Sequence, residues 1–175
     1  MQNRIYYCVK IIVCFLGQIS VAFAVTYTVN VNTDTNPGGG GSGSGTTGDL
    51  RYCLTQLNAS GTSGTIQFNF GVNTTITVAA NLPIITQTVT LQPTNGTTVT
   101  TINGASQYRL LATSNASLTL QNMILQNGKA KGDGYPVDIS DNNVATGGGM
   151  GAGGGVYIDI GKTLTMTNSK ILSCS

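Results

Sequence analysis

Apolar and polar residues alternate with a period of two in many short segments of this chain, beginning at Thr26. This alternation is typical of β-strands that bury one face and expose the other. The links between the segments are rich in Asn, Gly and Pro, the residues that form turns. The sequence therefore predicts an all-β fold. We expect strands at residues 26–32, 65–70, 75–79, 86–91, 97–104, 108–112, 117–128, 155–160 and 163–172.

One segment follows a different period and predicts the only helix beyond the N-terminal region. Its apolar residues lie at i, i+3, i+4 and i+7, which places them on one helical face. These residues are Leu50, Cys53, Leu54 and Leu57. Asp49 is a suitable N-cap, and Asn58 with Gly61 ends the pattern. Because so short a helix is not stable alone, we expect its apolar face to cover neighbouring strands.

Two segments resemble each other and indicate a repeat. Residues 118–122 (LTLQN) and 164–168 (LTMTN) are each followed by an Ile-Leu pair, at an offset of 46 residues. We interpret this offset as two coils of about 23 residues, a length typical of stacked repeats.

The sequence therefore predicts a right-handed, single-stranded parallel β-helix, pectin-lyase-like, in which successive coils stack about 4.8 Å apart. The short helix is expected to cap the first coil, since open strand edges need cover. An antiparallel sandwich is the alternative, because Asn95-Gly96 and Asn103-Gly104 suit hairpin turns.

The N-terminal residues have the pattern of a secretory signal peptide over residues 1–24. A basic start is followed by an apolar run that includes residues 11–16 and by an Ala-Phe-Ala sequence ending at Ala24. A membrane-spanning helix is the first alternative, but about 14 residues reach only about 21 Å of a core about 30 Å thick. A lipoprotein anchored at Cys14 is the second, and Val13 before it is larger than such signals require.

This interpretation divides the chain into three parts. The signal peptide is followed by an N-terminal cap at residues 25–64, which contains a strand, a flexible Gly/Ser-rich loop at 37–48 and the helix. The β-helix coils are expected over residues 65–175, with a Gly-rich insertion at 128–155. We expect the coils to be incomplete at the C-terminal end, because the sequence stops just after a strand without a cap.

Charge and cysteine content narrow the function only slightly. Arg4 and Lys10 belong to the predicted signal peptide, and the six basic residues that remain of eight equal the six acidic ones. The mature chain is then formally neutral, so we expect no affinity for nucleic acid. Cys53 and Cys174 lie in the exported part, where a disulfide and two unpaired thiols are both compatible with the sequence.

A series of short motifs runs in order through the mature chain. They are Gly48-Asp-Leu-Arg51, Gly64-Thr-Ile-Gln-Phe-Asn69, Leu82-Pro-Ile84, Val89-Thr-Leu91, Thr101-Ile-Asn-Gly104, Leu118-Thr-Leu-Gln-Asn122, Asn127-Gly128, Gly153-Gly-Gly-Val-Tyr157 and Leu164-Thr-Met-Thr-Asn-Ser169. In order and spacing the series resembles the N-terminal part of bacterial surface β-helix proteins. These include autotransporter passengers, repetitive adhesins and the chlamydial polymorphic outer-membrane proteins.

The resemblance implies an exported protein, extracellular or associated with the outer-membrane surface. It implies a structural or adhesive role without catalysis or cofactor, and an unknown host-surface or extracellular ligand as partner. It also implies that the mature segment does not itself span a membrane. The chain differs from members of this family in two ways. It stops after fewer coils, and it contains Cys53 and Cys174, whereas passengers contain few cysteines.

An enzyme of the same fold, a polysaccharide lyase or glycoside hydrolase, is the functional alternative. Such hydrolases need paired carboxylates, one to protonate the leaving group and one to activate water. Asn32-Thr-Asp34 matches one short piece of the polygalacturonase pattern, but the partner motifs are missing. Arg109 is the only basic residue between Tyr52 and Asn127, and we interpret it as a solvated or cap-pairing side chain. No catalytic residue is assigned.

The remaining acidic residues give weak candidates for metal ligands. Asp133, Asp138 and Asp141 lie in the Gly-rich insertion, and such hard oxygen ligands can bind Ca²⁺. Their spacing fits no calcium motif, and the glycine run at 147–155 lacks the Lys-Ser/Thr ending of a phosphate-binding loop. We interpret the insertion at 128–155 as a surface loop and as the first candidate for contact with a partner.

Two asparagines are assigned a structural role. Asn122 and Asn168 occupy equivalent places in the two similar segments. They are expected to stack as an amide ladder inside the turns, where they would satisfy backbone groups that otherwise cost about 1–3 kcal/mol each.

Overall fold

The computed structural model describes residues 24–131 and 153–175, which form β-strands and one short helix. The all-β class is confirmed. The predicted signal peptide, Cys14 and the candidates Asp133, Asp138 and Asp141 lie outside the described residues. The elements are β1 Val25–Val29, β2 Gly43–Ser44, β3 Thr47–Gly48, α1 Leu50–Ser60, β4 Gly64–Phe68, β5 Thr74–Thr77, β6 Val89–Pro93, β7 Thr100–Asn103, β8 Leu111–Ala112, β9 Leu118–Gln121, β10 Met123–Gln126, β11 Val156–Tyr157, β12 Leu164–Thr167 and β13 Lys170–Leu172.

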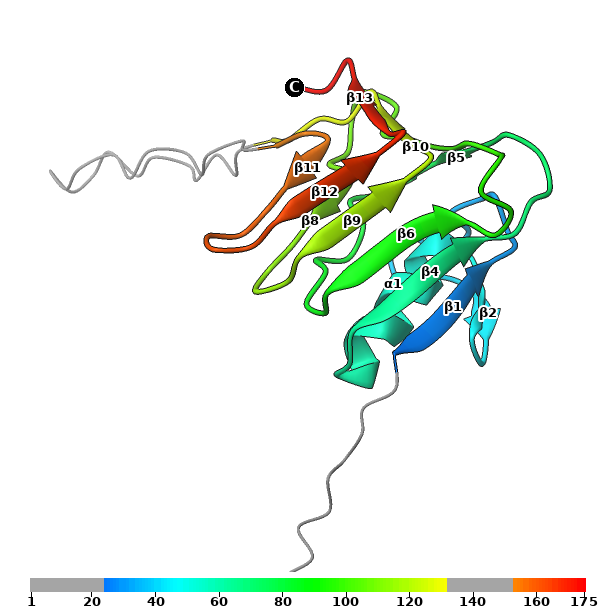
Figure 1. Ribbon diagram of the computed structural model, residues 1–175. Helices are drawn as coiled ribbons and strands as arrows, with labels where there is room; N and C mark the ends of the chain where they lie inside the picture. Colours follow the sequence, from blue (N-terminus) through cyan, green and yellow to red (C-terminus); the bar gives the residue numbers. More distant parts are fainter. Residues whose placement is uncertain (1–23, 132–152) are drawn as a thin grey trace, which may run out of the picture.

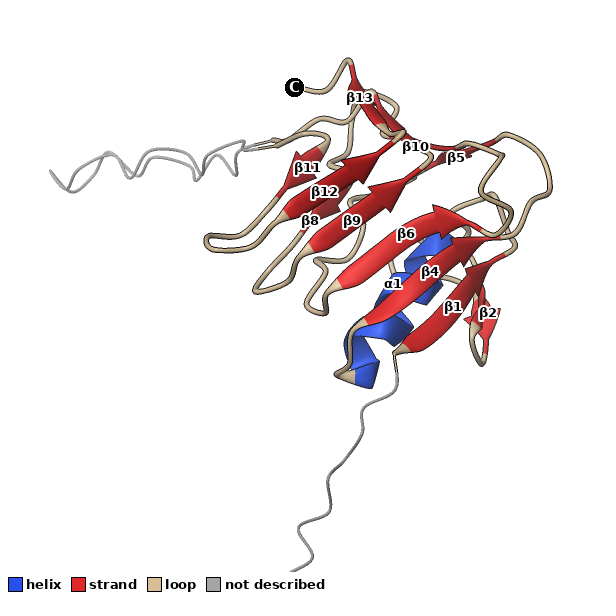
Figure 2. Cartoon of the chain, in the orientation of Figure 1, coloured by secondary structure: helices blue, strands red, loops and turns tan. Residues whose placement is uncertain are grey.

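The strands form three sheets in which almost every neighbouring pair is parallel (Figures 1 and 2). A seven-stranded sheet has the order β12-β9-β6-β4-β1-β3-β2, a four-stranded sheet β13-β10-β7-β5, and the third pairs β11 with β8. Among the strands at residues 24–131 and 153–175, only β2 and β3 are antiparallel. An antiparallel sandwich, the alternative that the Asn-Gly pairs allowed, does not fit this arrangement.

The two similar segments are direct neighbours, so the predicted repeat of two coils of about 23 residues is wrong. Leu118 pairs with Leu164 and Leu120 with Met166, which makes the 46-residue offset a single step from β9 to β12. The preceding step, from β6 to β9, pairs Val89 with Leu118. The step to β12 is longer because the Gly-rich insertion is part of it. An insertion in a loop lengthens the chain between two strands without changing their pairing.

Alternation within the strands produces the core. In β4, β6 and β9 every second side chain is buried and the side chains between them are half-buried on the opposite face. The inward row in register consists of Tyr27, Ile66, Leu91, Leu120 and Met166. The first four members are at most 7 % exposed, whereas Met166 on the last strand is 36 % exposed. Ile66, Leu91 and Leu120 are each covered by strands on both sides, whereas Met166 has a paired strand on one side only.

Two of the predicted strands are each broken by a sharp corner. Residues 117–128 form β9 and β10, which belong to different sheets, and residues 163–172 form β12 and β13 in the same way. Asn122 and Asn168 occupy the corners with φ of 53° and 49°. Asparagine tolerates this left-handed conformation better than other non-glycine residues. The two similar segments therefore repeat a strand-corner-strand unit.

The predicted loop at 37–48 contains secondary structure, so its interpretation as wholly flexible is wrong. It forms the β2–β3 hairpin, and β3 pairs in parallel with β1. A Cβ atom on Gly43 would lie 2.4 Å from the ring of Tyr52, and one on Gly48 would lie 2.7 Å from the same ring. The glycines are required here because the hairpin backbone packs directly against an aromatic side chain.

Helix α1 lies behind β4 and β1 in Figure 1 and contacts β1, β3 and β4. Its predicted apolar face is buried and consists of Leu50, Cys53, Leu54 and Leu57. The helix continues two residues beyond Asn58 and ends at Gly61, which adopts φ of 66° and donates its N–H to the carbonyl of Asn58. This left-handed residue is the common way to end a helix.

Asp49 is the N-cap of α1 and is fully buried. Its carboxylate accepts hydrogen bonds from the N–H groups of Tyr52 and Ser42, both at 2.8 Å, and from the hydroxyl of Thr35 at 3.0 Å. One side chain thus begins the helix and holds the glycine-rich hairpin and the segment after β1 against it.

We expect Asp49→Ala to lower the free energy of unfolding by at least the roughly 0.5–2 kcal/mol typical of a lost N-cap. The loss is increased because the N–H of Ser42 is left without its acceptor. Asp49→Asn is the matched control, since its amide oxygen still accepts one of these bonds. Urea unfolding followed by circular dichroism should show a larger loss of stability for Asp49→Ala than for Asp49→Asn. Equal losses in the two variants would contradict this prediction.

Candidate functional site

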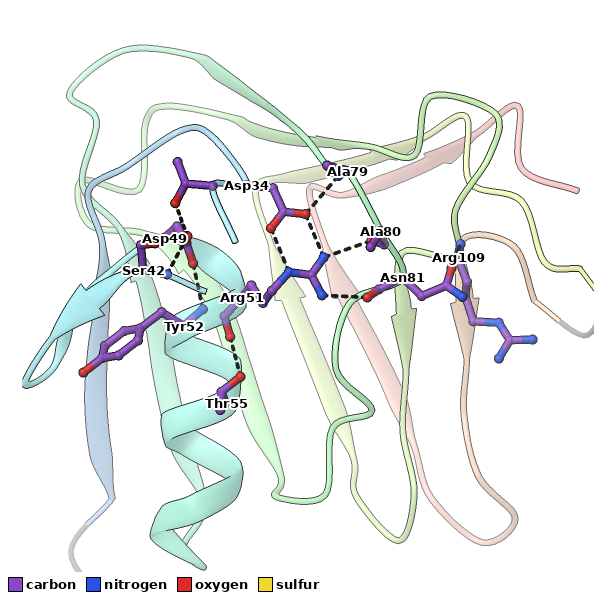
Figure 3. A network of polar contacts seen from close by, with 11 residues as sticks. Asp34, Ser42, Asp49, Arg51, Tyr52, Thr55, Ala79, Ala80, Asn81 and Arg109 are labelled. Carbon is purple, nitrogen blue, oxygen red and sulfur yellow. Dashed lines mark hydrogen bonds and ion pairs between the residues drawn. The ribbon is translucent and has the colours of Figure 1, made fainter. Parts of the chain in front are cut away.

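A buried ion pair, which was not predicted from the sequence, links the helix to two loops. Asp34 and Arg51 have side chains that are only 3 % and 4 % exposed. Nε and Nη2 of Arg51 each donate to one carboxylate oxygen of Asp34 at 2.7 Å, which is the bidentate geometry of strong arginine-carboxylate pairs. Figure 3 shows the pair between α1 and the loop after β5.

The same guanidinium also binds backbone carbonyls. Nη1 donates to the carbonyl of Asn81 at 2.7 Å and Nη2 to that of Ala80 at 3.0 Å. The backbone N–H of Ala79 donates to Asp34 at 2.9 Å. Both charges are therefore surrounded by hydrogen-bond partners, which is the condition for burying them. The arrangement is a structural clamp between α1, the segment after β1 and the loop after β5.

The electrostatic state of Asp34 follows from these contacts. Burial raises the pKa of its carboxyl, but the hydrogen bonds from Arg51 and the N–H of Ala79, with the positive charge of Arg51, lower it by more. The pKa of Asp34 consequently lies below its usual value, and the carboxylate stays ionised at neutral pH. Asp34, which belongs to the Asn32-Thr-Asp34 match to a hydrolase motif, is thus held as an ionised partner of Arg51.

Arg109 lies beside this clamp without joining it. Its backbone N–H donates to the side-chain oxygen of Asn81 at 2.9 Å, and its guanidinium extends away from Arg51 (Figure 3). The side chain is half-buried, and Nε has no hydrogen-bond partner among the described residues. The interpretation of Arg109 as a solvated or cap-pairing side chain stays a prediction, since its side chain is only half-buried.

Cys53 is inward-facing on α1 and wholly buried, and both Cys53 and Cys174 are free thiols. Burial, followed by the negative charge of Asp49, raises the pKa of the Cys53 thiol to about 12, although a hydrogen bond from Gly48 opposes the shift. A thiol of this pKa carries almost no thiolate at neutral pH, so it is a packing residue.

We expect iodoacetamide at pH 8 to alkylate Cys174, which is half-buried, well before Cys53. The thiolate is the reactive species, and Cys53 combines a raised pKa with zero exposure. Peptide mapping by mass spectrometry after timed quenching measures the two rates. In denaturant both cysteines should react alike, and equal rates in the folded chain would contradict the placement of Cys53.

The predicted amide ladder of Asn122 and Asn168 is seen only in part: the two residues follow the paired residues Gln121 and Thr167, but their amides do not bind each other. Asn122 is half-buried and Asn168 is exposed, and no hydrogen bond joins the two amides within the described residues. Asn122 instead donates from its amide to the carbonyl of Gly96 at 3.0 Å. The two asparagines share the left-handed backbone conformation at the corner between two strands, and forming this corner is their common structural role.

The two described ends of the Gly-rich insertion lie next to each other. Gly128 and Gly154 approach closely, since a Cβ on Gly128 would lie 2.3 Å from the carbonyl oxygen of Gly154. Within the described ranges no group of three or more His, Cys, Asp or Glu residues could hold a metal ion.

No described helix is long and apolar enough for a membrane crossing.

The outward face of the seven-stranded sheet carries a regular row of threonines, which we call the threonine ladder. Its members pair in register across five parallel strands: Thr26, Thr65, Thr90, Thr119 and Thr165. A second row lies two residues further along the same strands: Thr28, Gln67, Gln92, Gln121 and Thr167. All ten side chains are half-buried or exposed. We call the two rows together the ladder face.

The ladder face is uncharged and open. None of the five strands contains a charged residue. In Figures 1 and 2 the helix lies behind β4 and β1, and no described element covers the front of the sheet. Its hydroxyl and amide groups donate and accept hydrogen bonds but include no nucleophile with an adjacent base. These groups are able to form hydrogen bonds with a neutral polar partner.

Sequence reasoning overlooked the ladder although its signal is present. All five strands have Thr as their second residue: VTYTV, GTIQF, VTLQP, LTLQ and LTMT. Recognising a ladder requires the pairing register, because the strands are separated by links of unequal length. Comparisons of the chain with protein-family models, with curated proteins and with solved structures each gave no match.

Proposed function

We propose that the chain is an exported parallel β-helix segment that presents surface for binding, in the manner of a structural or adhesive passenger, and is not an enzyme. The observation that carries the proposal is the ladder face, an open recognition surface of ten uncharged polar side chains above an aliphatic core. A periodic surface of this kind requires stacked strands in constant register.

The order in which the chain visits the sheets supports the β-helix. From β4 onward the strands alternate between the seven-stranded and four-stranded sheets, and β8 and β11 add a third sheet at equivalent places. Parallel neighbours cannot be joined by tight hairpins, so the chain must return to the start of the sheet each time. Such crossovers are right-handed in nearly all known cases, which is the hand we propose.

The structural role of the buried charges supports a scaffold over a catalyst. Asp34 and Arg51 neutralise each other and have their hydrogen bonds filled by protein groups, so neither is available to a substrate. The pKa of Asp34 is lowered, and hydrolysis of glycosides requires an acid whose pKa is raised. The segment at 128–155 remains a proposed contact region.

Export and binding are tested together in a Gram-negative host. The full chain should be found outside the cytoplasm with its N-terminus at Val25, as determined by fractionation and N-terminal sequencing. Purified chain should give no turnover of pectin or alginate. Retention of an uncleaved chain in the cytoplasm would contradict export. Turnover that is lost in Asp34→Asn or Arg109→Gln would contradict the non-catalytic role.

A further inference from the structure

The ladder face has a two-dimensional repeat, and the repeat indicates what could lie on it. Neighbouring parallel strands are about 4.8 Å apart, and residues two apart on one strand are about 6.6 Å apart. Five strands in register therefore place hydroxyl and amide groups on a regular grid about 19 Å wide. We propose that this face binds the surface of ice, a solid whose oxygen atoms form an uncharged grid of similar dimensions.

Threonine suits this partner for two physical reasons. Its hydroxyl both donates and accepts hydrogen bonds, as a water molecule does, so it can occupy a position in a water lattice. Its branched Cβ restricts χ1, so a row of threonines is already ordered before binding. Thr65, Thr90 and Thr119 have further restriction from neighbours on both sides, and all three are half-buried. Little conformational entropy is then lost on contact with a rigid surface.

Strand propensity alone does not explain the ladder. Threonine is common on the outer faces of strands in general, so the four-stranded sheet provides an internal comparison. Its outward residues in register are Thr75, Thr101, Ile124 and Lys170, which change from polar to apolar to charged. The four-stranded sheet changes residue type within its four strands, whereas the seven-stranded sheet keeps threonine through five. The regularity therefore belongs to one face.

Other partner classes fit the face less well. An anionic polymer or membrane requires basic groups, and the five ladder strands contain none. Sugar rings and protein hot spots favour aromatic or arginine contacts, whereas the outward residues here are only Thr and Gln. The two aromatic residues in these strands, Tyr27 and Phe68, point inward and are 7 % and 1 % exposed. An uncharged lattice of water is the partner that matches both the charge and the repeat.

Inhibition of ice recrystallisation by the purified full chain tests the inference, which does not depend on the proposed export or β-helix hand. Thr90→Lys changes the centre of the ladder, and Thr101→Lys is the matched control at the centre of the other sheet. We expect the parent chain and Thr101→Lys to keep ice crystals small and Thr90→Lys to lose the effect. Thr119→Lys repeats the test at a second ladder position in case Thr90→Lys fails to fold, which thermal unfolding reports.

Three results would overturn the inference. The first is a folded parent chain that leaves recrystallisation and ice-crystal shape unchanged. The second is an equal loss in Thr101→Lys, which would remove the assignment to one face. The third is retention on microcrystalline cellulose or chitin that Thr90→Lys abolishes while the parent has no effect on ice, which would assign the face to a neutral polysaccharide.

Discussion

Replacing Asp34 by asparagine lowers the free energy of unfolding by about 3–5 kcal/mol, the cost of leaving one member of a buried ion pair without its partner. The guanidinium of Arg51 is only 4 % exposed and loses both bidentate contacts to a carboxylate. The asparagine amide group also presents a donor where Arg51 and the N–H of Ala79 both need an acceptor. Equilibrium unfolding in urea measures the loss.

Asp159→Asn is the matched control for this substitution. Its carboxylate also accepts backbone N–H groups, from Asn115 and Ile160 at 2.8 Å each, but it lies in a turn at the surface. Exposed substitutions usually change stability little, so the control should lose far less than Asp34→Asn. Equal losses in the two variants would show that Asp34 is not buried against Arg51.

The same pair gives the chain a defined acid sensitivity. The folded pKa of Asp34 is lower than its unfolded value of 3.8, so the unfolded state takes up the proton first as the pH falls. The contribution of Asp34 to stability is complete above the unfolded pKa and is lost as the pH falls through the folded one. Unfolding at pH 6 and at pH 3 measures this, and Asp34→Asn should have a smaller difference between the two pH values than the parent chain.

Leu120→Ala should cost about 2–5 kcal/mol, because it removes a fully buried side chain from the centre of the inward row. Leu120 is 0 % exposed and pairs in register with Leu91 on one side and Met166 on the other. Met166→Ala removes the next member of the same row, which is 36 % exposed and should cost clearly less. Thermal and urea unfolding of both variants compare them. A larger loss for Met166→Ala would contradict the order of the strands.

Local patterns predicted most of the elements correctly. Period-two alternation identifies a segment such as Thr65-Ile-Gln-Phe because its side chains alternate between core and solvent. The helix was predictable from Leu50, Leu54 and Leu57 with an acidic N-cap, since these signals act within one or two turns. Signals of this range do not require knowledge of which strand lies beside which.

The features that were missed depend on contacts between distant residues. Arg51 is buried because Asp34, 17 residues before it, and the carbonyls of Ala80 and Asn81 surround its guanidinium. Charged side chains are usually exposed, so its burial has no local signal. The repeat length was misjudged for a similar reason, because the spacing of similar segments does not distinguish one long step from two short ones. The ladder face was missed because it exists only once the register is known.

The pairing of β9 with β12 is the central claim, and disulfide formation between Thr119→Cys and Thr165→Cys tests it most directly. These residues are partners on adjacent strands, about 4.8 Å apart, within the range that a disulfide spans. In a Cys174→Ser background, mild oxidation should join them, whereas Thr90→Cys with Thr165→Cys should stay reduced. If Thr119→Cys and Thr165→Cys stay reduced, or if the Thr90 pair forms instead, β9 and β12 are not neighbours in this register.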